Sequence, residues 1–245
     1  MQQQLTEEKC IEELNKICHL VKLSKESLKY LMPGWTFDPI RILIFGRSKL
    51  GKTTLAMAIF ATSFFNIVDN IFVVSPNYAQ KTFDGLRCFV DDDNIYDQTE
   101  SLNVYEEIFN KLTNIHKDNP DSKSLLIVDD VSTDTSTNTG RKGPFAKLVI
   151  SAPHLNLSII GIFHQVKTVT GTFRDNADII IAFEPSSQAE FETLIRDLMP
   201  ISFTKNYNKN LDILETSWKN GSFISIIRLI RKGTIVLKEF NDALI

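Results

Sequence analysis

Residues 46–53 read Gly46-Arg47-Ser48-Lys49-Leu50-Gly51-Lys52-Thr53, which matches the pattern G-x-x-x-x-G-K-[ST] at each of its fixed positions. The two glycines allow a tight loop whose backbone N–H groups converge on a chain of phosphates. Lys52 can reach the β and γ oxygens, and the Thr53 hydroxyl can ligate Mg²⁺. The stretch therefore predicts a binding site for a nucleoside triphosphate and its metal ion.

The segments on either side of this loop have the composition that the motif requires. Residues 40–45 form an apolar run that only Arg41 interrupts, and residues 54–64 are rich in apolar side chains and lack Pro and Gly. This is the order strand, loop, helix, in which the helix N-terminus presents free amides to an anion. We assign these residues to nucleotide binding: Gly46, Arg47, Ser48, Lys49, Leu50, Gly51, Lys52, Thr53 and Thr54.

Composition places the chain among soluble globular proteins. It has 245 residues, of which 43% are hydrophobic and 23% charged, and this suits one sizeable core. The formal net charge of −3 argues against indiscriminate coating of nucleic acid but leaves room for a local basic stripe. No apolar run approaches the roughly 18 residues of a membrane span, and the polar start is unlike a secretory signal, so we expect an intracellular protein.

Three cysteines form an odd set without a C-x-x-C pair: Cys10, Cys18 and Cys88. This spacing supports neither a disulfide framework nor a zinc site, so free thiols are expected.

Short apolar runs alternate with helical patterns along the middle of the chain, as in a parallel α/β sheet. Further strands are expected at residues 70–75, 125–129, 157–163 and 179–183. Helices are expected at residues 79–86, 102–115 and 144–150.

The two ends of the chain extend this core. Residues 1–36 predict a helical appendage, with an amphipathic helix over residues 6–21 and a shorter one over residues 24–31. Residues 37–245 form the predicted nucleotide-binding domain, with its core at 40–183 and a C-terminal helix and hairpin within 186–245. The hairpin strands are expected at 223–230 and 234–240.

Two acids follow the apolar run at residues 125–128, as expected where a buried strand opens onto a phosphate site. This looks like a Walker B motif, in which Asp129 would hold Mg²⁺ and Asp130 would polarise the attacking water. Gln165, at the end of another buried strand, could bond the same water and a γ-phosphate oxygen; the alternative is a solvent-facing loop residue. We expect a supporting or packing role for His164.

Three segments, FGRSKLGKTTL, LLIVDD and HLNLSIIGIFHQVKTVTGTFRDNADIIIAF, resemble the FtsK/HerA superfamily of DNA-translocating ATPases. Within it, the chain is most similar to the poxvirus-type genome-packaging ATPases of large DNA viruses. The resemblance implies a RecA-like P-loop NTPase, a mostly parallel central sheet flanked by helices. It also implies that the Gln165 strand lies between the phosphate-loop strand and the Walker B strand, and that subunits form a ring around double-stranded DNA.

One position departs from this pattern. Viral packaging relatives often have Arg-His before the Gln-bearing strand, where this chain has Pro153-His154. Ring ATPases commonly complete the site with an arginine from a neighbouring subunit. Arg174 is the first candidate and Arg141 the second, although a surface salt bridge would explain either. The loop over residues 132–143 could couple hydrolysis to DNA in a central pore, or it could be a plain surface loop.

We therefore expect a magnesium-dependent ATP hydrolase that packages or translocates double-stranded DNA as a homo-oligomeric ring. A capsid or portal component is a further expected partner, in the host cytoplasm or at the site of virion assembly, without a membrane. Two alternatives stay open on the sequence. A nucleotide-dependent assembly switch would need binding without productive turnover, and a small-molecule kinase would need an acceptor pocket and an arginine-bearing lid, which the sequence does not reveal.

Overall fold

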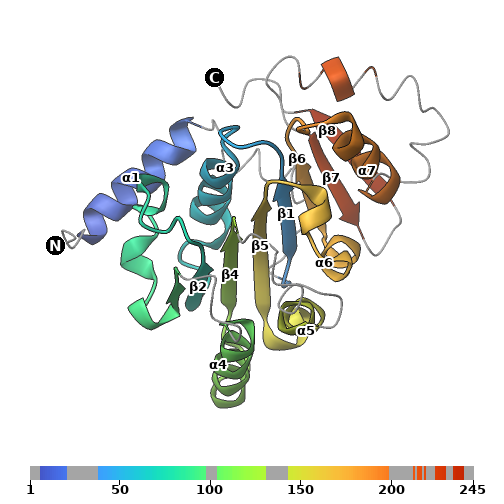
Figure 1. The fold of residues 1–245 in the computed structure, drawn as a ribbon. Helices are drawn as coiled ribbons and strands as arrows, with labels where there is room; N and C mark the ends of the chain where they lie inside the picture. The colour runs from blue at the N-terminus through green and yellow to red at the C-terminus, as the bar shows by residue number, and fades with distance from the viewer. Residues whose placement is uncertain are drawn as a thin grey trace.

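The computed structural model describes residues 6–20, 38–97, 104–130 and 143–198, together with 212, 214–216, 218 and two strands at 224–229 and 234–239. Its centre is a sheet of eight strands in the order β3-β2-β4-β5-β1-β6-β7-β8 (Figure 1). The strands are β1 (Arg41–Phe45), β2 (Asn70–Val74), β3 (Ile95–Tyr96), β4 (Ser124–Asp129), β5 (Leu157–Phe163), β6 (Ile179–Ala182), β7 (Ile224–Leu229) and β8 (Thr234–Glu239).

The first six strands of this order run parallel to one another, and β7 and β8 add an antiparallel hairpin at the β6 edge. The mostly parallel sheet and the C-terminal hairpin are therefore confirmed. β5 pairs with β1 on one side and with β4 on the other, so the strand that precedes Gln165 lies between the phosphate-loop strand and the strand of the two acids.

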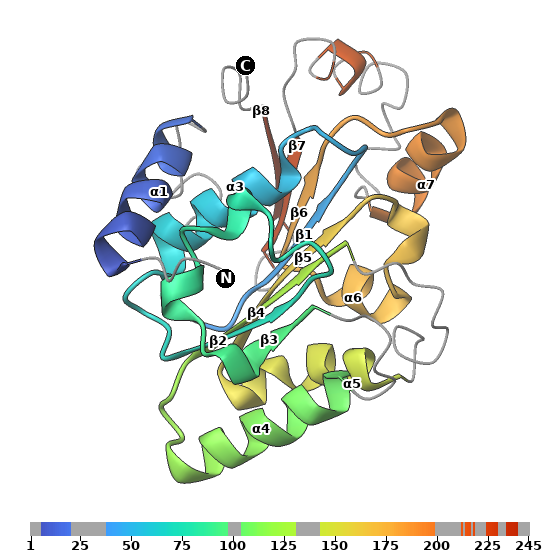
Figure 2. The ribbon, with the colours of Figure 1, turned by 60° about the vertical axis from the view of Figure 1, so that its left-hand side comes forward.

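Helices cover both faces of the sheet, which Figure 2 shows nearly edge-on. One face carries α1 (Glu7–Leu20) and α3 (Lys52–Ile59), which continues as a π-helical turn over Phe60–Phe64. The other carries α4 (Val104–Asp118), α5 (Pro144–Ser151), α6 (Gly171–Asn176) and α7 (Gln188–Leu198). None of the helices in the described ranges is both long and apolar enough to cross a membrane.

The parallel strands β1, β2, β4, β5 and β6 are mostly apolar because both of their faces are buried. In β1, Leu43 and Phe45 point into the core under α4 to α7, whereas Ile42 and Ile44 point into the core under α1 and α3. Alternate side chains of a strand project to opposite faces, so a single strand supplies both cores. This is why the predicted strands read as continuous apolar runs.

The helix predicted over residues 79–86 is wrong. The chain there forms separate 3₁₀ turns, Lys81–Phe83 and Arg87–Phe89. The guanidinium of Arg87 donates hydrogen bonds to the carbonyl oxygens of three residues before the first turn: Tyr78, Ala79 and Gln80. The Arg87 side chain thus takes the place of backbone amides at the Tyr78 and Ala79 carbonyls, while the Gln80 carbonyl also accepts a hydrogen bond from the Phe83 amide at 3.0 Å, as in a 3₁₀ turn.

One helix was not expected. The hydroxyl-rich segment after β5 contains α6, whose N-cap Thr170 accepts a hydrogen bond from the Phe173 amide at 3.1 Å. The predicted second N-terminal helix, over residues 24–31, lies outside the described residues, as do residues 131–142 with Arg141.

The expectation of three free thiols is also wrong. Cys10 of α1 and Cys88 form a disulfide between residues 78 positions apart in the chain, and Cys18 is free. The pairing arises because α1 packs closely over this connection. A Cβ atom added to Gly85 would lie 2.8 Å from a methyl carbon of Leu14. The spacing of the cysteines along the sequence does not indicate such a contact.

This disulfide predicts a measurable contribution to stability. A cross-link of this span disfavours the unfolded chain, so Cys88→Ser should lower the free energy of unfolding by about 2–4 kcal/mol. Denaturant titration without reductant measures the loss, and Cys18→Ser is the matched control that should stay near the wild-type value. Thiol titration of the unreduced, unfolded wild-type chain should find one reactive thiol, and a count of three would contradict the bridge.

Candidate nucleotide-binding site

The loop between β1 and α3 has the backbone shape of an anion cradle. Three of its residues have positive φ: Gly46 (145°), Lys49 (65°) and Gly51 (84°). At Gly46 a Cβ atom would lie 2.5 Å from the Cβ of Phe183, so the close approach of the loop to the end of β6 requires glycine. Gly51 caps α3 without a side-chain hydrogen bond, which leaves the first amides of the helix available to an anion.

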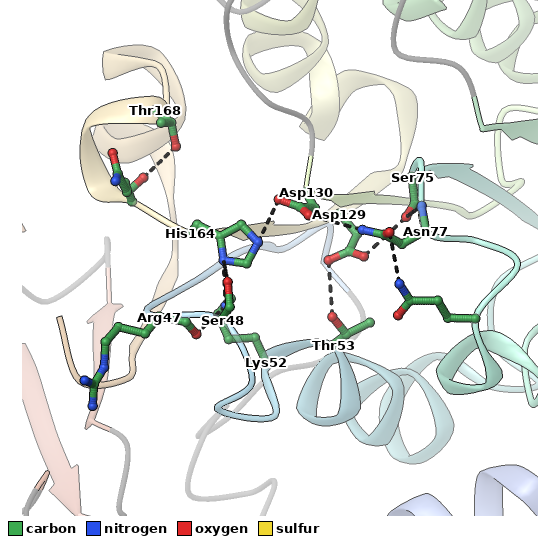
Figure 3. Close-up of polar contacts among 12 residues, drawn as sticks. Arg47, Ser48, Lys52, Thr53, Ser75, Asn77, Asp129, Asp130, His164 and Thr168 are labelled. Atoms are coloured by element: carbon green, nitrogen blue, oxygen red, sulfur yellow. Dashed lines mark hydrogen bonds and ion pairs between the residues drawn. The ribbon is translucent and has the colours of Figure 1, made fainter. Parts of the chain in front are cut away.

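Lys52 is folded back over this loop (Figure 3) and is only 5% exposed. Its Nζ donates a hydrogen bond to the Arg47 carbonyl at 2.8 Å and lies 3.2 Å from Nδ1 of His164. Burial lowers the pKa of Lys52, while the negative charges of Asp129, Asp130 and Glu190 oppose that change. A phosphate chain in the loop would supply the negative charge that a buried ammonium group favours.

Asp129 ends β4 and is 4% exposed. One carboxylate oxygen accepts a hydrogen bond from the Thr53 hydroxyl at 3.3 Å, and the other accepts one from the Ser75 hydroxyl at 3.2 Å. Burial and the adjacent charge of Asp130 raise the pKa of Asp129 to about 6, although these hydrogen bonds and Lys52 act in the opposite direction. The carboxylate is thus held in a place that penalises its negative charge.

Asp130 follows in a left-handed conformation, with φ of 50°, which short polar residues tolerate. This turn presents its carboxylate to two partners, as Figure 3 shows. One oxygen lies 2.7 Å from Nε2 of His164, and the other accepts a hydrogen bond from the Asn77 side-chain amide at 3.1 Å.

His164 connects Asp130 with the phosphate loop. Its Nδ1 lies 3.2 Å from the Ser48 hydroxyl and 3.2 Å from the Lys52 ammonium group. Because an ammonium group can only donate, the contact with Lys52 makes Nδ1 the acceptor, and Nε2–H then faces the Asp130 carboxylate. The imidazole therefore links the loop lysine and the second acid in one hydrogen-bonded chain.

The structure brings some of the predicted site residues together and leaves others apart. Lys52, Thr53, Asp129 and Asp130 share one polar cluster at the edge of the sheet. Gln165 is located at the end of β5 beside them, but its side chain is exposed, and its carbonyl accepts a hydrogen bond from the Thr168 hydroxyl at 2.7 Å.

Arg174, the arginine expected to act on a neighbouring subunit, is engaged within its own chain. Its guanidinium pairs with Asp197 of α7 at 3.0 Å, and the side chain is 20% exposed. The other candidate, Arg141, is outside the described residues.

Sequence reasoning missed the parts that Ser75 and Asn77 play and gave His164 only a supporting role. A signal for all three was present. Ser75 and His164 directly follow the parallel strands β2 and β5, and Asn77 comes two residues after Ser75. The carboxyl ends of neighbouring parallel strands meet at one edge, so polar residues immediately after those strands are candidates for the same site.

Solved structures share this fold. The genome packaging NTPase B204 from Sulfolobus turreted icosahedral virus 2, in complex with AMP, matches with a TM-score of 0.61 and 17% identity over 83% of this chain and 98% of that chain. Its complex with ATP-gammaS matches with a TM-score of 0.59 and 16% identity, over the same shares of the two chains. The cytoplasmic domain of the Thermomonospora curvata type VII secretion ATPase EccC matches with a TM-score of 0.56 and 12% identity, over 84% of this chain and 25% of that one.

No curated protein sequence matches the chain. A family match covers most of it: residues 28–231 fit the family described as Poxvirus A32 protein. The matched region contains the phosphate loop, both aspartates at the end of β4 and the last parallel strand. The chain therefore belongs to the Poxvirus A32 protein family.

Proposed function

We propose that this protein is a magnesium-dependent ATPase that packages double-stranded viral DNA. The observation that carries the proposal is the meeting of Thr53 and Asp129, 3.3 Å apart, beside the buried lysine of a phosphate loop. Membership of the Poxvirus A32 protein family supports the viral assignment. The fold shared with the packaging NTPase B204, solved with AMP and with ATP-gammaS, supports both the nucleotide and the process.

The residues at the end of β4 suit Mg²⁺. A hydroxyl and a carboxylate are hard oxygen donors, and magnesium in nucleotide sites usually combines one or two carboxylates with phosphate oxygens and water. The raised pKa of Asp129 reflects a buried charge that a cation would stabilise. When bound, the ion would neutralise charge on the phosphate oxygens.

The remaining side chains then have distinct tasks. Lys52 would exchange its contacts with His164 and the Arg47 carbonyl for phosphate oxygens. Asp130 would accept a proton from the attacking water while the water oxygen bonds to the γ-phosphorus and the bond to the β–γ bridging oxygen breaks. Asn77 and His164 would hold the Asp130 carboxylate in place, and Gln165 would orient the water from the end of β5.

We propose that subunits assemble as a ring around DNA, with a capsid or portal component as a docking partner at the site of genome packaging. Arg174 stays the first candidate for an arginine that acts in trans. To do so it would have to exchange Asp197 for the phosphoryl group of a neighbouring subunit.

Two substitutions separate nucleotide binding from turnover. Lys52→Ala should abolish both, because it removes the cation that faces the phosphates. Asp130→Asn should still bind ATP but hydrolyse it about 10²–10⁴-fold more slowly, since an amide cannot accept the proton. Phosphate release and binding of a fluorescent ATP analogue measure the two properties, with the exposed Lys117→Ala as control for Lys52→Ala. Full hydrolysis by Asp130→Asn would move the role of base to another residue.

The response to DNA distinguishes the packaging motor from its alternatives. Double-stranded DNA should stimulate ATP hydrolysis by the wild-type chain, and the stimulation should weaken as salt rises because phosphate contacts are screened. A switch protein would be indifferent to DNA, and a kinase would instead require a small acceptor. An ATPase rate independent of DNA at low salt would contradict the motor.

The pKa of Asp129 predicts a dependence of stability on pH. Because folding raises this pKa from 3.8 to about 6, the folded chain binds the proton more tightly, and this contribution to stability is lost as pH rises from about 4 to about 6. In EDTA, Asp129→Asn should therefore gain thermal stability relative to wild type as pH rises through this window. Thermal unfolding at pH 4.5 and pH 7.5 measures the difference, and an equal effect at both would contradict the shift.

A further inference from the structure

Glu190 carries a buried negative charge outside the nucleotide cluster. It is in the first turn of α7 and is 5% exposed. A carboxylate removed from water is costly unless hydrogen-bond donors or opposite charges surround it. The contacts of this side chain therefore indicate what it does in the molecule.

The two oxygens of Glu190 bind two different loops. Oε1 accepts a hydrogen bond from the Val166 amide, in the loop after β5, at 3.2 Å. Oε2 accepts hydrogen bonds from the amide and the hydroxyl of Ser186, in the loop after β6, at 2.9 and 2.6 Å. One buried carboxylate thus bridges the segments that follow two strands on either side of β1.

Capping of α7 does not account for these contacts. Ser187 and Glu190 have the spacing of a capping box, in which the glutamate would return to the amide of the serine. The serine half is present, since the Glu190 amide donates to the Ser187 hydroxyl at 3.3 Å. The carboxylate instead reaches past the helix to Ser186 and Val166.

Both bridged loops adjoin the nucleotide cluster. Val166 is two residues from His164, which contacts Asp130 and Lys52. Glu184, two residues before Ser186, forms an ion pair with Arg47 of the phosphate loop, and the Arg47 amide donates to the Glu184 carbonyl at 3.4 Å. Glu190 therefore closes a ring of contacts that runs from the phosphate loop through both segments and back to His164.

We infer that Glu190 is a positioning residue for ATP hydrolysis. It holds the loop that carries His164 and Gln165 at a set place relative to the phosphate loop, through Val166 on one side and Ser186 on the other. Its hydrogen bonds are made to the two loops and not to the phosphate cradle, so its main effect is on the rate of turnover. Against the lowering by burial, its charge also raises the pKa of Lys52, and Ser186→Ala, which keeps that charge, tests the bridge by itself. The inference rests on the ATPase function proposed above.

The test is Glu190→Gln in the full-length chain. The amide keeps the shape of the side chain but has a single acceptor oxygen, so it can serve one loop and not both. A displaced loop should lower kcat by about tenfold to a hundredfold, whereas KM for ATP should stay within about twofold. The matched control is Glu192→Gln, the same change of charge on the exposed face of the same helix, which should retain the wild-type kcat.

A second variant tests the same inference if Glu190→Gln fails to fold. Ser186→Ala removes one donor from the Oε2 side only, and it should lower kcat by a smaller factor in the same direction. Added to Glu190→Gln, it should cost less than the product of the two separate effects, because both act through one carboxylate. Assays run well below the unfolding temperature of each variant separate loss of rate from loss of folded protein.

The possible outcomes distinguish failure of the positioning role of Glu190 from failure of the proposed ATPase function. If the wild-type chain hydrolyses ATP and a folded Glu190→Gln or Ser186→Ala has the wild-type kcat, the positioning role is refuted while the ATPase stands. A raised KM with unchanged kcat refutes it equally. If the wild-type chain does not hydrolyse ATP under any DNA condition, the proposed function itself fails.

Discussion

The site depends on the parallel pairing of β1 between β5 and β6. This pairing brings the ends of three strands to one edge of the sheet, and it sets the phosphate loop against the end of β6 so closely that Gly46 has no room for a side chain. Pairing of β5 with β4 extends the same edge to Asp129 and Asp130. A shift of one residue in any of these registers would turn the end of a strand toward the opposite face and take its polar residues out of the cluster.

Charged side chains meet at this edge of the sheet, where burial disfavours their charged forms. Burial lowers the pKa of Lys52 and raises that of Asp129, so both groups are biased toward their neutral forms by their surroundings. Hydroxyls from Thr53 and Ser75 satisfy the hydrogen-bonding oxygens of Asp129 but carry no compensating charge. The triphosphate and metal ion proposed above would supply both signs of charge at once, which is the electrostatic argument for that proposal.

Contacts beyond the cluster keep these groups in place. The Arg47 and Glu184 pair ties the phosphate loop to the segment after β6, and Glu190 ties that segment to the loop after β5. On the opposite face, the Cys10–Cys88 disulfide secures α1 over the connection that follows β2. The nucleotide-facing loops are therefore braced by interactions between segments that are far apart in sequence.

The sequence by itself determined the class of fold and located the phosphate-loop motif and the paired acids to which binding and catalysis are assigned in the proposal. Buried parallel strands must be apolar on both faces, so their positions can be read directly, and the predicted bounds of β5 match the observed ones. The G-x-x-x-x-G-K-T pattern is local, as is the pair of acids after β4, so each could be identified without a fold. Only the tertiary structure decided the partners of those residues: His164 between Lys52 and Asp130, Ser75 beside Asp129, and Cys10 against Cys88. Such contacts join segments whose distance in space is set by strand order and helix packing, and no spacing along the chain encodes that distance.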